Sequence, residues 1–243
     1  MPRKVLFLRN DPTAPEGLLG EVFAESGFDV STFDVVPADR PDDPVLEVVF
    51  PDPLGYDAIV PLGARWAVYD ERVPWIADES TMVRHALDGG LGVLGVCFGG
   101  QLLAHALGGT VARSPQPEIG WCEVHTDNPD VVPAGPWFQW HFDRLTAPPG
   151  AVTVARNGSA TQAFVKGRAL GLQFHPEVDA ALVDYWIAED GEADLTQLGL
   201  VADDIRARKP GQLTRSEPAA NLGTGLRAGP GTWLAGGGHR RHR

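Results

Sequence analysis

Cys97 has the sequence surroundings of a reactive thiol. It lies in the segment Gly-Val-Cys-Phe-Gly-Gly-Gln over 95–101, which follows an apolar run and opens a stretch with helical periodicity. A nucleophile on a tight strand-to-helix turn needs glycines on both sides, because a Cβ atom there would collide across the turn. The N-terminus of a following helix favours the thiolate, which is the nucleophilic form. A small buried hydrophobe is the commoner role of a cysteine, and the flanking glycines disfavour it here.

A histidine and a glutamate two residues apart provide the partners that a thiolate nucleophile needs. His175 comes at the end of an apolar stretch, and Glu177 follows after one proline. Residues i and i+2 of an extended chain point to the same side, so the imidazole and the carboxylate can meet. The carboxylate would hold one tautomer of the imidazole and stabilise its protonated form. The backbone N–H of Phe98, directly after the cysteine, is expected to face a developing oxyanion.

The elements that must position these residues alternate along the first half of the chain. Apolar runs predict strands over 5–8, 28–35, 58–60 and 92–96, and amphipathic stretches predict helices over 18–25, 75–87 and 100–107. Strands that are apolar throughout are typical of a parallel sheet covered on both faces. Shorter strands are predicted near 121–125, 137–141, 152–156, 160–165 and 169–174, followed by a helix over 179–189. We therefore expect an α/β three-layer sandwich with a mostly parallel central sheet flanked by helices, plus a smaller antiparallel strand region.

Composition excludes several classes of function. The 243 residues include 32 acidic and 20 basic side chains, and the net charge of −12 disfavours binding to nucleic acid or to anionic membranes. No apolar run reaches the roughly 20 residues of a membrane-spanning helix, and the start lacks a secretory signal, so we expect a cytoplasmic protein. Two cysteines exclude a disulfide framework. The histidines and cysteines lack ligand spacing and no Gly-rich phosphate loop is present, so we expect no metal and no cofactor.

Further segments carry a resemblance to a known family. In chain order they are 63–66 with 68–70, 74–76, 95–109, 118–121, 140–143, 162–164 and 173–177. Together with Cys97 and His175 they make the sequence similar to the class I (triad) glutamine amidotransferases. More narrowly, it resembles free-standing members related to the glutaminase domain of GMP synthase. The resemblance covers residues 1–190, which we expect to form the amidotransferase domain. A helical extension over 191–209 and a poorly ordered Gly/Pro/Arg-rich tail over 210–243 would follow, the alternative for the tail being a basic arm that docks on a partner.

The resemblance implies that the protein hydrolyses the side-chain amide of L-glutamine. Cys97 would attack the amide carbon, ammonia would leave with a proton from His175, and water would hydrolyse the thioester, with Glu177 completing the triad. The oxyanion hole would take one N–H from Phe98 and one from the turn at Gly63 and Ala64. Gln101, His141 and Asp143 match positions that bind the substrate in the family. The family often has Gly-Gly-Pro where this chain has Gly-Ala-Arg over 63–65, and an alanine restricts positive φ.

Three functional hypotheses stay open at this point. The first is a glutaminase that passes ammonia to a separate synthetase partner, because the chain after residue 190 is too short to house a synthase site. The second is a partner-independent hydrolase or acyl transferase that uses the same triad on γ-glutamyl peptides or amides. The third is a catalytically silent binding module, which the intact Cys97, His175 and Glu177 disfavour.

Overall fold

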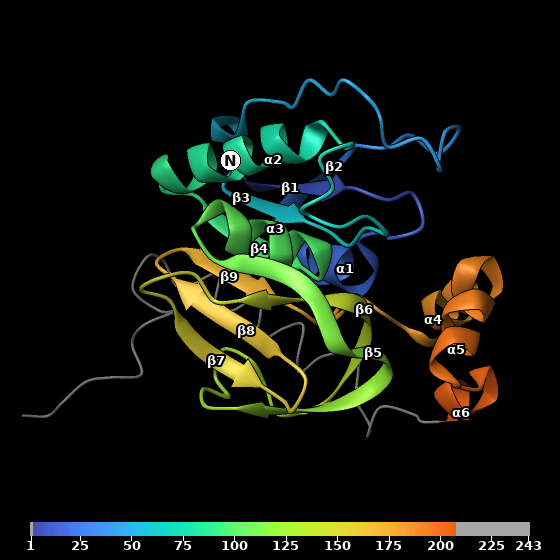
Figure 1. Cartoon of the computed structure of the whole chain (residues 1–243). Coiled ribbons are helices and arrows are strands. Elements are labelled where there is room, and N and C mark those ends of the chain that lie inside the picture. Colours follow the sequence, from blue (N-terminus) through green and yellow to red (C-terminus); the bar gives the residue numbers. More distant parts are fainter. Residues whose placement is uncertain (1, 208–243) are drawn as a thin grey trace, which may run out of the picture.

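One nine-stranded sheet organises the computed structural model, which describes residues 2–207 (Figure 1). Five strands are parallel: β1 (Arg3–Arg9), β2 (Phe28–Asp34), β3 (Ala58–Pro61), β4 (Gly92–Val96) and β9 (Ala169–Leu172). Four antiparallel strands continue the sheet: β8 (Thr161–Lys166), β7 (Val152–Arg156), β5 (Thr110–Thr126) and β6 (Gly135–Thr146). The spatial order is β2-β1-β3-β4-β9-β8-β7-β5-β6. The predicted α/β class with a mostly parallel core is confirmed.

Helices cover both faces of the parallel strands and make three layers. In β1, Val5 and Phe7 point to the face that packs with α1 (Gly17–Glu25). The alternate residues Leu6 and Leu8 point to the other face, which packs with α2 (Trp75–Asp88) and α3 (Phe98–Ala106). This alternation follows from the two-residue period of a strand, and both faces are apolar because both are buried.

The C-terminal helices form a separate group beside the antiparallel strands (Figure 1). They comprise α4 (Ala180–Trp186), a single π-helical turn η2 (Ile187–Gly191), α5 (Glu192–Leu198) and α6 (Ala202–Ala207). Their apolar residues, among them Val183, Ile187 and Leu195, pack in a third cluster with Ile119 and Phe138 of β5 and β6. This contact places the η2 turn close to Cys97 and His175, which follow the parallel strands β4 and β9.

Several predicted boundaries were wrong. The strands expected over 121–125 and 137–141 are parts of much longer strands, β5 and β6. Two prolines, Pro115 and Pro117, hid the first half of β5, and the pairing there is interrupted by a bulge between Arg113 and Glu118. The structure also begins α3 at Phe98, ends β9 at Leu172 and replaces the end of the helix expected over 179–189 with η2.

Three further points concern the residues that the structure describes. The tail predicted over 210–243 lies outside the described residues. Within residues 2–207, no helix is both long and apolar enough to cross a membrane. A three-residue helical turn, η1 (Pro53–Gly55), interrupts the loop between β2 and β3.

Candidate active site

Cys97 lies on a strained turn between β4 and α3. Its φ of +51° and ψ of −108° make it the one non-glycine with positive φ among residues 2–207. A Cβ atom at Gly95 would lie 2.3 Å from the carbonyl oxygen of Gly99, and one at Gly99 would lie 2.0 Å from that of Pro61. Such a conformation costs on the order of 1–3 kcal/mol and persists only where the surroundings enforce it. The glycine pattern seen in the sequence is therefore required by close approach of the backbone.

His175 and Glu177 form a buried hydrogen-bonded pair. Nδ1 of the imidazole lies 2.7 Å from Oε1 of the glutamate, and the two side chains are 4% and 1% exposed. The backbone fixes both residues, because the N–H of His175 donates to the carbonyl of Phe138 and the N–H of Leu18 donates to the carbonyl of Glu177. A carboxylate accepts the Nδ1 proton, so Nε2 is the nitrogen available for proton exchange.

The electrostatics of the site favour a protonated His175. Burial alone lowers the pKa of the imidazole, but the adjacent Cys97 thiolate and the Glu177 carboxylate outweigh it and raise that pKa to about 10. His175 is thus an imidazolium at neutral pH. The ring of Trp186 stands edge-on to the imidazole, with centroids 4.9 Å apart, and covers it on the side of the C-terminal helices.

The sulfur of Cys97 has two further polar neighbours. It lies 3.8 Å from the carbonyl oxygen of Trp140 and 4.0 Å from Nε2 of Gln173. The Gln173 amide cannot turn round, because its Oε1 accepts hydrogen bonds from Nε2 of Gln101 and from the N–H of Leu145, both at 3.3 Å. Its N–H groups therefore face the sulfur.

A cavity of about 380 Å³ opens beside this cysteine. Its wall includes every predicted site residue except Glu177, which lies behind His175; these are Cys97, His175, Phe98, Ala64, Gly63, Gln101, His141 and Asp143. The C-terminal helices add Trp186, Glu189, Gly191 and Asp194. Among residues 2–207, no group of three or more histidine, cysteine, aspartate and glutamate side chains is placed to hold a metal ion.

The predicted substrate-binding residues differ in whether their polar atoms are already bonded within the protein. His141 donates from Nδ1 to the carbonyl of Asp143 at 2.9 Å, and its Nε2 lies 3.3 Å from Glu118. Gln101 donates from Nε2 to the same carbonyl at 3.2 Å. These contacts within the protein give both side chains a part in shaping the wall. The Asp143 carboxylate instead faces the phenol of Tyr69, whose OH donates to Oδ1 at 3.0 Å.

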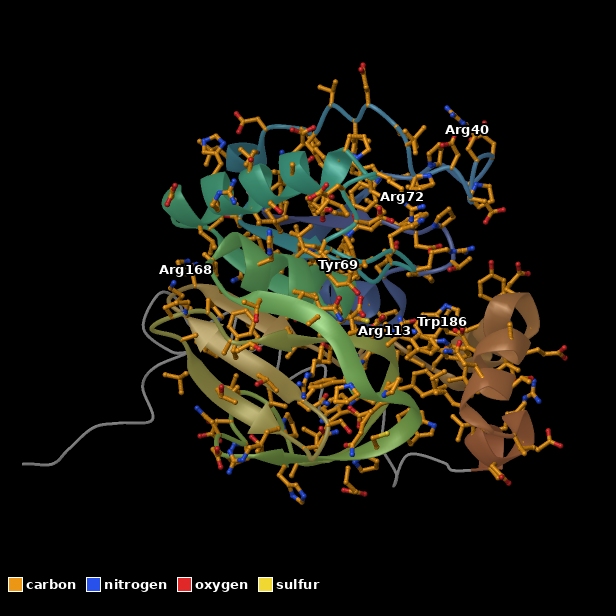
Figure 2. All side chains as sticks on the ribbon, in the orientation of Figure 1. Arg40, Tyr69, Arg72, Arg113, Arg168 and Trp186 are labelled. Carbon is orange, nitrogen blue, oxygen red and sulfur yellow. The ribbon has the colours of Figure 1, made fainter. Side chains whose placement is uncertain are left out.

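The cavity wall also holds residues that were not predicted as site residues, among them Tyr69, Arg113 and Trp186 (Figure 2). Burial and the Asp143 carboxylate raise the pKa of Tyr69, so its phenol stays neutral and donates. Arg113 stacks on the ring of Phe142 at 4.6 Å and lies 3.9 Å from the Asp143 carboxylate. Tyr69 belongs to a segment that resembles the family, and this resemblance was the only sequence feature that could have identified it as a site residue. No sequence feature identified Arg113 and Trp186, because Arg113 reaches the cavity through the long β5 and Trp186 through the packing of α4.

The mixed sheet and the cysteine turn between β4 and α3 define the architecture of an α/β amidotransferase. Residues 25–190 match the family model described as glutamine amidotransferase class-I, and the chain belongs to this family. The resemblance predicted from the motifs is confirmed. Among solved structures, a glutamine amidotransferase from Thermotoga maritima superposes with a TM-score of 0.73 at 27% identity, covering 93% of this chain and 95% of that one. A second, from Methylobacillus flagellatus, gives a TM-score of 0.72 at 23% identity over the full length of both chains.

Similar curated sequences include glutamine-hydrolysing GMP synthases. The protein from Thermomicrobium roseum is 39% identical over 132 residues, which is 51% of this chain and 24% of that protein. The protein from Mycobacterium marinum is 36% identical over 145 residues, which is 55% of this chain and 25% of that protein. The chain thus spans about a quarter of the length of the curated relatives that it matches.

Proposed function

We propose that this protein hydrolyses the side-chain amide of glutamine with Cys97 as nucleophile, His175 as acid and base, and Glu177 as the orienting carboxylate. One observation carries the proposal. The strained cysteine lies in the same cavity as an imidazole whose other nitrogen is held 2.7 Å from a buried carboxylate. Membership of the glutamine amidotransferase family supports the choice of an amide as the bond that is cleaved.

The first half of the reaction forms a thioester. The Cys97 thiolate attacks the amide carbon, a C–S bond forms, and the C=O electron pair moves to oxygen. N–H groups of Phe98 and of the turn at Gly63 and Ala64 bind this oxyanion. When the oxyanion collapses, the C–N bond breaks and the imidazolium of His175 gives its proton to the departing nitrogen, which leaves as ammonia.

The second half releases glutamate. The now neutral His175 takes a proton from water, whose oxygen attacks the thioester carbon through a second oxyanion. The C–S bond then breaks, and the electron pair returns to sulfur as a thiolate beside the imidazolium. Glu177 keeps its charge throughout and stabilises each imidazolium state.

The α-amino and α-carboxyl groups of the substrate have oppositely charged partners in the wall. The Asp143 carboxylate suits an ammonium group, and the Arg113 guanidinium, 3.9 Å from it, suits a carboxylate. Tyr69 holds Asp143 through its phenol. Gln101 stabilises the same segment by donating a hydrogen bond to the Asp143 carbonyl.

Ammonia released here is proposed to pass to a synthetase partner. The relatives that support this are GMP synthases, in which a matching region is about a quarter of the chain. The test of the core proposal is release of glutamate from L-glutamine by the full chain, with Cys97→Ala as control. Hydroxylamine added during turnover should divert the thioester to γ-glutamyl hydroxamate. If a thiol-reactive reagent labels Cys97 but neither glutamate nor γ-glutamyl hydroxamate is formed from L-glutamine, the proposal for glutamine is overturned.

A second candidate is a hydrolase or acyl transferase acting on γ-glutamyl peptides or amides. The cavity favours it, because its wall extends beyond the cysteine turn to Trp186, Glu189 and Asp194 of the C-terminal helices. The volume of about 380 Å³ lies near the lower end of the range of about 300–1,000 Å³ typical of small-molecule sites. A panel of γ-glutamyl dipeptides compared with L-glutamine by kcat/KM separates the two candidates.

A further inference from the structure

The turn over 62–65, which contains Gly63 and Ala64, is anchored at its first residue. The carbonyl oxygen of Leu62 accepts hydrogen bonds from Nδ2 of Asn10 at 3.2 Å and from the N–H of Gly99 at 3.1 Å. The second proton of the Asn10 amide goes to Oε1 of Glu79, also at 3.2 Å. Asn10 and Glu79 are completely buried. Because both acceptors lie at its nitrogen, the Asn10 amide has one stable orientation, with Nδ2 toward the turn.

The same turn is anchored at its last residue by Asp11. The backbone N–H of Arg65 donates to Oδ2 at 3.3 Å, Nε donates to Oδ2 at 2.7 Å, and Nη2 donates to Oδ1 at 3.3 Å. Thr13 adds its backbone N–H at 2.9 Å and its hydroxyl at 2.7 Å, both to Oδ1. Asp11 is 2% exposed, and every one of these neighbours is a donor. A carboxylate is therefore the group that this position requires.

The two residues between these anchors keep their donors available. Within residues 2–207, no acceptor is bonded to the N–H of Gly63 or of Ala64. Both residues line the cavity with Cys97, and a Cβ atom at Gly63 would lie 3.2 Å from Cε1 of His175. Ala64 fits without strain, because its φ is not positive. The alanine at position 64 therefore does not prevent the turn from donating.

We infer that Asn10 and Asp11 form a clamp that fixes the oxyanion-binding turn within this chain. Asn10 holds the carbonyl of Leu62, and Asp11 holds the N–H and the guanidinium of Arg65. The two residues are adjacent and follow the last residue of β1, so one strand end holds both ends of the turn. Asn10, Asp11 and Arg65 are then positioning residues, and the oxyanion hole forms without a partner protein. The inference rests on the proposed cysteine chemistry and adds that hydrolysis does not wait for a partner.

The test compares two reactions of Cys97 in the full chain. Hydrolysis of L-glutamine, or of the best substrate from the dipeptide panel, passes through oxyanions. Alkylation by iodoacetamide displaces iodide from carbon and passes through none, so it reports only on the thiolate and its access. The variants are Asp11→Asn and Arg65→Gln, each alone and combined, with Arg65→Lys as the conservative change. Arg72→Gln is the matched control, because Arg72 pairs with Asp70 in an exposed ion pair.

The clamp predicts a specific pattern of rates. Asp11→Asn and Arg65→Gln should each lower kcat by about tenfold or more, since loss of one oxyanion donor costs about 10²–10³ in kcat. The alkylation rate should stay within about twofold of the unmodified protein. The double variant should be no worse than the poorer single variant, because both changes release the same turn. Arg65→Lys should recover part of the activity, and Arg72→Gln should change neither rate.

Three results would overturn the inference. Unchanged kcat in both single variants would mean that the turn needs no clamp. Alkylation falling in parallel with kcat would place the damage at the thiolate rather than at the turn. Absence of hydrolysis by the unmodified chain on every γ-glutamyl substrate, with normal alkylation, would overturn the proposed function as well. That last result differs from the first two, in which the unmodified chain is active.

Discussion

The side-chain nitrogen of Gln173 lies 4.0 Å from the sulfur of Cys97, and the oxygen of the same amide is held by two donors. The amide is completely buried, so its dipole points at the sulfur with little screening. A thiolate gains from N–H groups aimed at it, whereas a neutral thiol gains little. Gln173 therefore favours the charged form of the nucleophile.

Replacement of Gln173 by methionine, which has similar length and no donor, should slow alkylation of Cys97 at pH 7 by about fivefold. A hydrogen bond to a charged group contributes about 1 kcal/mol or more, which corresponds to that factor. Gln173→Glu should slow it further, because a second carboxylate would face the sulfur. The measurement is the rate of iodoacetamide incorporation in each variant, followed by mass spectrometry. Equal rates in all three proteins would remove Gln173 from the account of the thiolate.

Glu177→Gln tests the role of the buried carboxylate in the pH dependence. The Cys97 thiolate and Glu177 raise the pKa of His175 to about 10, so the imidazolium acid is present below that pH and is lost above it. The alkaline limb of kcat/KM should accordingly lie near pH 10 in the unmodified protein. Removal of the charge should move this limb to lower pH and lower kcat by about 10²–10⁴-fold.

The control for this profile is Glu123→Gln, which removes an exposed carboxylate from β5. It should leave both kcat and the limb unchanged. An alkaline limb that stays in place in Glu177→Gln would show that the carboxylate does not stabilise the imidazolium.

The cysteine turn and the His-Pro-Glu pair were predictable from the sequence because their geometry is local. Gly95 and Gly99 are needed within one turn, and His175 meets Glu177 across two residues of extended chain. The remaining relationships depend on strand order. Asp11 meets Arg65 because β1 pairs with β3, and the cavity position of Arg113 follows from the length of β5. In the sequence, Pro115 and Pro117 disfavour a strand at this position, and in the structure a bulge accommodates them. No residue-level pattern foretold these contacts.

Glu79 should make stability depend on pH in the alkaline direction. Burial raises the pKa of this carboxyl to about 8, and the hydrogen bond from Asn10 offsets only part of that effect. A carboxyl whose pKa is higher in the folded state than its ordinary 4.5 binds a proton that the unfolded chain has released. The folded state therefore loses stability as pH rises above 4.5, and the loss is complete above about pH 8.

Glu79→Gln should remove this dependence while keeping an oxygen that accepts from Asn10. Relative to the unmodified protein, the variant should gain roughly 2–4 kcal/mol between pH 5 and pH 9, since each pKa unit corresponds to about 1.4 kcal/mol. The measurement is the free energy of unfolding from urea titrations of both proteins at the two pH values. A difference between the proteins that is the same at both pH values would mean that Glu79 is not protonated in the folded state.

Gly99→Ala should destabilise the protein severely, because the new methyl group would lie 2.0 Å from the carbonyl oxygen of Pro61. Neither partner can move away easily, since the oxygen is backbone at the end of β3 and Gly99 donates its N–H to Leu62. Overpacking of this kind costs about 1–3 kcal/mol in a yielding core and more where backbone must shift. The matched control is Gly158→Ala, where a Cβ atom would meet nothing within 4 Å. Thermal unfolding of the two variants should show a large fall in Tm for the first and almost none for the second. A Tm for Gly99→Ala equal to that of the control would mean that the turn can open, in which case the strain at Cys97 would not be enforced by this contact.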